Sequence, residues 1–266
     1  MRNRTIAMTI FAALALAALA AAASLAAAKV TTQTASAGGL TATLSYSNGP
    51  GITTKDERLT ITQHGSKVYD EQLSATGCFK VCSPEGKRPV HVAKLYGDDG
   101  EDVVLTLFTG GADCCTLADV FVPSAAVQSY VLDQHNFGED GFVLKNIGPG
   151  GRPEFVSADP AFYCRFSACY ASGLPLEIFE FEGERFIDVT RHHRGMIAAD
   201  GARWLKLYYK NPALGRGAIA AWAGDEDNLG YAATVRTVLQ LQTADGHLTS
   251  SFVITLEHFL ANHHYT

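Results

Sequence analysis

Residues 95–105, LYGDDGEDVVL, and residues 147–157, IGPGGRPEFVS, share one pattern. Each stretch opens with an aliphatic residue, passes through a glycine-rich turn, reaches an acidic residue (Asp102 or Glu154) and continues as an apolar run. Glycine adopts the backbone conformations that tight turns need, and β-branched and aromatic residues favour strands. The repeated pattern therefore predicts a chain assembled from strand–turn–strand units.

Strand patterns continue on both sides of these two turns. Residues 40–46, LTATLSY, alternate apolar and polar side chains with the period of a half-buried strand. Residues 59–73 and 176–189 are typical of hairpins, and their turns contain Gly65 and Gly183. We therefore predict a β-rich domain with degenerate repeat turns over residues 40–190.

The hydrophobic periodicity changes after Arg191. Residues 197–210 carry apolar side chains at helical spacing, and the pattern stops just before Pro212, which cannot continue a helix. Residues 217–243 predict interrupted helices, and residues 249–262 predict a last helix. The C-terminal quarter of the chain is therefore expected to be helical.

The expected fold class is mainly β, with propeller-like or sandwich-like antiparallel sheets and a C-terminal α-helical segment. That segment, residues 191–266, is expected to pack on the sheet, and Ser250 or Ser251 is expected to cap the last helix. Residues 40–190 hold about three repeat units, whereas propellers typically need at least four blades. Either an incomplete propeller-like stack or a sandwich satisfies this pattern.

The first 28 residues are typical of a secretory signal peptide. Arg2 and Arg4 precede an alanine-rich apolar run over residues 6–28, which ends in small residues before Lys29. The alternative is an uncleaved anchor, because the run is long enough to span a bilayer. We expect cleavage, hence a secreted or periplasmic protein with no membrane span afterwards. The small polar residues 29–39 predict a linker or a weakly held first strand.

Composition limits the classes of partner. The chain of 266 residues has 27 acidic and 21 basic side chains, a formal net charge of −6, and loss of Arg2 and Arg4 with the leader would make it −8. Nucleic-acid binding requires clustered lysine and arginine, so this balance argues against it. We expect an unidentified extracellular or envelope ligand, and no cofactor.

The six cysteines fall into three local couples, and an oxidising compartment would pair them. The couples are Cys78 with Cys82, Cys114 with Cys115, and Cys164 with Cys169. Two alternatives remain open at this point: pairing of Cys114 and Cys115 with other loops, and a zinc site.

The two repeated turns resemble the loops of FG-GAP or VCBS-type repeats. Those loops read Asp-x-Asp-x-Asp-Gly-x-x-Glu before a hydrophobic strand, and the resemblance implies propeller-like blades whose loops often bind calcium. Residues 106–116, TLFTGGADCCT, and 151–159, GRPEFVSAD, are also similar to a group of secreted bacterial proteins of unknown function that carry a Gly-Gly-Ala-x-Cys-Cys motif. The resemblance covers roughly residues 90–190.

The calcium pattern is incomplete in this chain. Lys94 and Tyr96 occupy the first two acidic positions of the first turn, where Asp98 and the later Asp102 remain as calcium candidates. Asn146 and two glycines occupy the corresponding positions of the second turn. Because calcium needs several oxygen ligands at short spacing, we predict metal-free turns. Asp102 and Glu154 are expected to hold the turns by accepting backbone N–H bonds.

The motif around the adjacent cysteines is a candidate ligand site. The glycines allow a close approach of the backbone, so its N–H groups can form a concave site for an anion or a carbonyl. The alternative is a tight corner made rigid by the cysteines. The candidate residues are Gly110, Gly111, Asp113, Cys114 and Cys115.

The predicted function is an exported, disulfide-stabilised binding or structural module of the cell envelope or exterior. The alternative is a secreted hydrolase of glycan or cell-wall polymer, with Glu154, Asp159 or Asp113 as its acidic catalyst. A carboxyl in a cleft opposite another carboxyl would favour the enzyme, and carboxyls that cap backbone turns would favour the binding module. The adjacent histidines His192 and His193 are interpreted as surface residues.

Overall fold

The computed structural model describes residues 29–49, 53–79, 82–96, 100–111, 114–212 and 215–265. Within these ranges it contains thirteen strands in three antiparallel sheets, three short 3-10 helices and four α-helices. The chain is therefore mainly β with a C-terminal helical segment, as predicted. The predicted leader, Asp98 and Asp113 lie outside the described residues.

The first sheet is a four-stranded meander. Its strands, in spatial order, are β1 (Val30–Ala37), β2 (Leu40–Asn48), β3 (Thr54–Gln63) and β4 (Ser66–Gln72). Residues 29–39 are thus a paired strand and its turn rather than a linker, since every residue of β1 pairs with β2. Three β-branched threonines suit a strand, and Gly38 and Gly39 take the positive φ angles of the tight turn that follows.

The second and third sheets follow in chain order. The second contains β5 (Ser83–Pro84), β6 (Val90–Ala93), β7 (Asp102–Phe108), β8 (Thr116–Ser124) and β9 (Ser129–Asn136), and both β5 and β6 pair with β7. The third contains β10 (Val143–Lys145), β11 (Glu154–Ala158), β12 (Leu176–Glu182) and β13 (Arg185–Asp188) in sequential order. Each repeated turn thus leads directly into a strand, β7 or β11.

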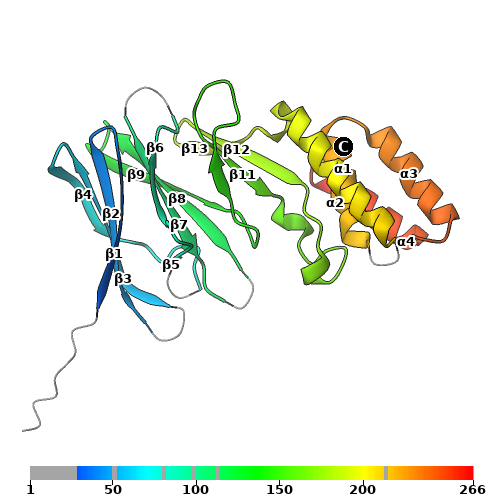
Figure 1. The fold of residues 1–266 in the computed structure, drawn as a ribbon, viewed down its shortest axis with the longest axis horizontal. Helices are drawn as coiled ribbons and strands as arrows, with labels where there is room; N and C mark the ends of the chain where they lie inside the picture. Colours follow the sequence, from blue (N-terminus) through cyan, green and yellow to red (C-terminus); the bar gives the residue numbers. More distant parts are fainter. Residues whose placement is uncertain are drawn as a thin grey trace, which may run out of the picture.

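The three sheets are stacked, as Figure 1 shows, and the second sheet contributes to two cores. Alternate residues of a strand point to opposite faces, so Leu105 and Leu107 of β7 pack toward the first sheet while Val104 packs toward the third. In β8, Phe121 likewise packs toward the first sheet and Val120 toward the third. The described strands form a sandwich-like stack and no closed ring.

Four helices complete the described chain. They are α1 (Arg194–Lys210), α2 (Arg216–Asn228), α3 (Ala232–Ala244) and α4 (Ser250–Asn262). Their core includes Trp222, Leu239 and Leu256 together with Phe162, which belongs to the connection between β11 and β12. α1 also contacts β12, so the helices pack on the third sheet at one end of the stack (Figure 1).

The cap of the last helix differs from the prediction. Thr249, rather than Ser250 or Ser251, is the N-cap, and its Oγ1 accepts a hydrogen bond from the Phe252 amide. Thr249 keeps the extended backbone that the cap position favours, whereas both serines already lie inside the helix. In the described part of the chain no helix has both the length and the apolar composition needed to span a bilayer.

All six cysteines form disulfides, which join Cys78 to Cys82, Cys114 to Cys115 and Cys164 to Cys169. The prediction of three local couples is confirmed. Cross-pairing and the zinc alternative are wrong, because no cysteine thiol remains free.

Candidate functional site

The first repeated turn is closed by Asp102. Its Oδ2 accepts hydrogen bonds from the amides of Leu95 at 3.0 Å and Tyr96 at 3.3 Å, as predicted. The side chain is buried, and this burial raises the pKa of Asp102 to about 6. Asp102 is therefore already engaged as an acceptor for the backbone. No group of three His, Cys, Asp or Glu suited to a metal occurs among the described residues.

In the second repeated turn the acidic residue has a different partner. The Glu154 carboxyl lies against Gly148 of its turn, and its Oε2 lies 2.8 Å from Nε2 of His193 rather than on a backbone amide. Burial raises the pKa of Glu154. The prediction that Glu154 holds its turn by backbone hydrogen bonds is wrong, and so is the surface interpretation of His193. His193 is the N-cap residue of α1, and the helix places it over the third sheet with its side chain 12% exposed.

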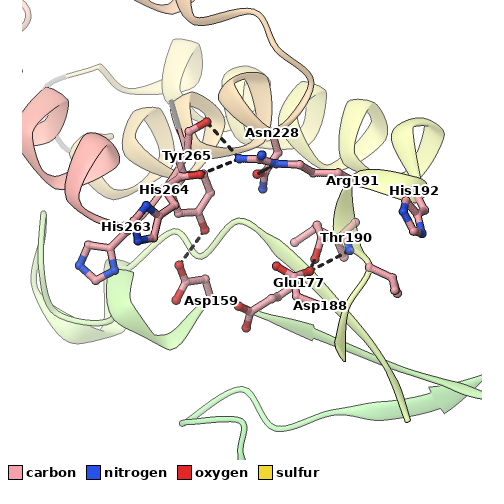
Figure 2. A pocket seen from close by; sticks show the side chains of 12 residues that line it. Asp159, Glu177, Asp188, Thr190, Arg191, His192, Asn228, His263, His264 and Tyr265 are labelled. Atoms are coloured by element: carbon pink, nitrogen blue, oxygen red, sulfur yellow. Dashed lines mark hydrogen bonds between the residues drawn. The ribbon is translucent and has the colours of Figure 1, made fainter. Parts of the chain in front are cut away.

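A polar pocket of about 480 Å³ lies between the third sheet and the end of the helical segment. Asp159 follows β11, Glu177 belongs to β12 and Asp188 ends β13. Figure 2 shows these carboxyls on the strand side, with Tyr265 and Arg191 on the helical side. The pocket thus gathers side chains from positions that are more than one hundred residues apart in the sequence.

Two of the three carboxyls are held by hydrogen bonds. Asp159 Oδ1 accepts from the amide of Ala161 at 2.8 Å, and its Oδ2 accepts from the Tyr265 hydroxyl at 2.7 Å. Asp188 Oδ1 accepts from the amide and the hydroxyl of Thr190. These bonds fix the directions of both carboxyls before any ligand arrives.

Glu177 is the exception among the three. No hydrogen bond joins its carboxyl to another described residue, and its side chain is half-buried in the pocket. Desolvation, followed by the negative charges of Asp159 and Asp188, raises the pKa of Glu177 to about 8. Near neutral pH this carboxyl is therefore mostly protonated, and it ionises in mildly alkaline solution.

Arg191 fastens the C-terminal residues over the pocket. Its Nη2 donates to the carbonyl oxygens of His264 at 2.6 Å and Tyr265 at 3.3 Å, and its Nε donates to Asn228 Oδ1 at 3.2 Å (Figure 2). These bonds hold the end of the chain in place, so that the Tyr265 hydroxyl reaches Asp159.

Another buried carboxyl contacts Leu176, one of the residues that line the pocket. Asp225 of α2 has no exposed surface, and its Oδ1 accepts from the amide of Leu176 at 3.1 Å, which ties the helix to the start of β12. Desolvation and the nearby Asp200 carboxylate raise the pKa of Asp225 to about 9. A neutral carboxyl therefore connects the helical segment to the strand that carries Glu177.

The structure separates the candidate residues that the sequence indicated. Asp159 lines the pocket, whereas Glu154 lies at the His193 contact. Gly110, Gly111, Cys114 and Cys115 belong to the β7–β8 connection and do not line the pocket. In that connection Gly110 and Gly111 have positive φ, and Thr109 Oγ1 accepts from the Cys115 amide.

Three important pocket residues were missed: Glu177, Asp188 and Tyr265. The hairpin pattern carried a signal for the first two. Antiparallel pairing aligns Ala158 with Leu176 and Phe179 with Asp188, so the end of β11, the start of β12 and the end of β13 meet at one end of the sheet. Tyr265 had no such signal, because its position depends on the packing of the helices.

Comparisons with family models, with curated proteins and with solved structures found no match to this chain. The resemblance to FG-GAP or VCBS repeats thus depends on the two turns at residues 95–105 and 147–157.

Proposed function

We propose that this protein is an exported binding module whose ligand site is the pocket between the third sheet and the helical segment. The observation that carries the proposal is the pocket itself, in which Asp159 and Asp188 are held in fixed directions and the Glu177 carboxyl accepts no hydrogen bond from another described residue. Its volume of about 480 Å³ is in the range of small-molecule sites.

Export is supported by two features. The first 28 residues have the pattern of a signal peptide. All six cysteines are paired, and disulfides persist mainly in oxidising compartments. Expression of the full chain in a bacterial host, followed by fractionation and N-terminal sequencing, tests this part. We expect a shortened chain outside the cytoplasm, and an intact chain with reduced thiols inside the cell would contradict export.

The ligand site is tested by screening a small-molecule library against ¹⁵N-labelled protein. Binders are expected to shift the backbone amide signals of Glu177, Thr190 and Tyr265 while leaving the first sheet unchanged. Binders that shift only the signals around Cys115 would move the site to the β7–β8 connection. A screen without any binder at these three amides would contradict the proposal.

One observation favours a hydrolase as the second candidate. Asp159 lies in the same pocket as Glu177, whose raised pKa suits a general acid. In that case Glu177→Gln lowers the release of reducing sugar from soluble glycans by at least about 100-fold. Glu182→Gln, an exposed change on the same strand, serves as the matched control. Absence of glycan cleavage by the unmodified protein would remove this candidate.

A further inference from the structure

We propose that the pocket between the third sheet and the helical segment takes a small ligand bearing a protonated amine, which Glu177 receives as a carboxylate. This inference rests on the proposed function, because it names the ligand class for the same pocket.

The charges around the pocket favour a cation. Asp159, Glu177 and Asp188 supply three carboxyls, and Arg191 is the one lysine or arginine among the described lining residues. The Arg191 guanidinium is already engaged by Asn228 and by two backbone carbonyls. An anionic ligand would therefore meet uncompensated carboxylates, whereas an ammonium group would be attracted to them.

Glu177 is the carboxyl with the most free acceptor capacity, because neither of its oxygens accepts a hydrogen bond from another described residue. Both oxygens of Asp159 already accept hydrogen bonds, and Asp188 accepts two bonds from Thr190 on Oδ1, so only its Oδ2 is uncommitted. An ammonium group has three donors and no acceptor, so it suits a carboxylate whose oxygens are not committed. The fixed carboxyls on either side would contribute charge, and Glu177 would contribute the direct contact.

Proton release should accompany such binding. The pKa of Glu177 is about 8 because burial and the charges of Asp159 and Asp188 oppose its ionisation. The other titratable groups that line the pocket are Arg191, Tyr265 and three histidines, His192, His263 and His264. An ammonium group next to Glu177 favours the carboxylate, so the ligand displaces the proton. Affinity should then rise about tenfold per pH unit below pH 8 and level off above it.

Three probes of equal length and different charge test the inference. They are 1,4-diaminobutane, 1,4-butanediol and succinate, each titrated calorimetrically into the full mature protein at pH 6, 7, 8 and 8.5. Two buffers of different ionisation enthalpy report the proton balance. We expect the diamine to bind best, with close to one proton released at pH 7, and the diol and succinate to bind at least about tenfold more weakly.

Two variants assign the effect to Glu177. Glu177→Gln should abolish the proton release and flatten the pH dependence, and it should weaken diamine binding at pH 8 at least about tenfold. Glu182→Gln lies on the same strand outside the pocket and should change neither quantity. Unchanged proton release in Glu177→Gln would overturn the inference.

The outcomes separate this inference from the proposed function. Binding of the diol or succinate at the pocket amides without binding of the diamine would refute the amine class and leave the ligand site intact. If none of the three probes binds, the amine class is also refuted. Failure of the wider library screen at the same amides is the separate result that would remove the site itself.

Discussion

The two repeated turns have similar sequences and use their acidic residues differently. Asp102 closes the first turn by accepting two backbone N–H bonds, whereas Glu154 in the second turn is directed to His193 of the helical segment. The first turn lies at the edge of a sheet that is enclosed by two others, and the second lies where the third sheet meets the helices. One repeat motif therefore stabilises its own loop in one place and joins two parts of the protein in the other.

Among the changes that test this comparison, loss of the Asp102 carboxyl should have the largest effect on the free energy of unfolding. Asp102→Ala leaves the amides of Leu95 and Tyr96 without their acceptor, and we expect a loss of about 3 kcal/mol in the free energy of unfolding. Urea denaturation measures this loss. Asp102→Asn keeps a side-chain oxygen and should cost clearly less. Equal losses in the two variants would mean that the carboxyl does not close the turn by these bonds.

On the side of the helical segment, Asp225 makes the stability of the protein depend on pH. The pKa of Asp225 is about 9 in the folded state, whereas an unfolded aspartate ionises near pH 4. Between these values the folded state holds a proton that the unfolded state lacks, so Asp225 lowers stability by roughly 1.4 kcal/mol for each unit of rising pH.

Asp225→Asn tests this dependence. The amide resembles the neutral acid and still accepts from Leu176, so the variant should lose much of the decline in stability between pH 7 and pH 9. Urea titrations at pH 7, 8 and 9 provide the measurement. Glu177→Gln is the comparison variant: it should remove the part of the decline in stability that lies below about pH 8 and leave the slope between pH 8 and pH 9 unchanged. A parallel decline in wild-type protein and Asp225→Asn would exclude Asp225 as the cause.

The contact between Glu154 and His193 should make a smaller contribution. A double-mutant cycle with Glu154→Gln and His193→Gln isolates their interaction, and we expect a coupling free energy of about 1 kcal/mol at pH 7. Additive effects would show that the two side chains lie close together without stabilising the junction.

Addition of calcium should have the smallest effect on stability. The Asp102 carboxylate already serves backbone amides, and Glu154 faces an imidazole, so neither acid is available to an ion. We expect the same melting temperature in millimolar calcium and in chelator. A stabilisation that Asp102→Asn removes would restore the calcium interpretation of the first turn.

Local patterns predicted much of the fold. The turns at Gly65 and Gly183, the stop before Pro212 and the three cysteine couples all depend on neighbouring residues, and the structure contains them. β1 was less certain, because a threonine-rich strand without large apolar residues resembles a polar linker.

The pocket was harder to predict, because it depends on contacts between distant segments. Asp159 was a candidate through its place after the second repeat, but its partner Tyr265 is 106 positions away. Glu177 looked like an ordinary polar residue of an alternating strand. Its pKa is raised first by burial and then by the charges of Asp159, which follows β11, and Asp188, which ends β13 at the same end of the sheet.

The double role of the second sheet restricts how this chain can be divided. Removal of the first sheet would expose Leu105 and Leu107 to water, and removal of the third would expose Val104 and Phe137. No cut between the sheets therefore yields two self-sufficient fragments. Truncation is best placed outside the stack, and any shortened version that lacks one sheet should be insoluble unless another protein covers the apolar face it leaves.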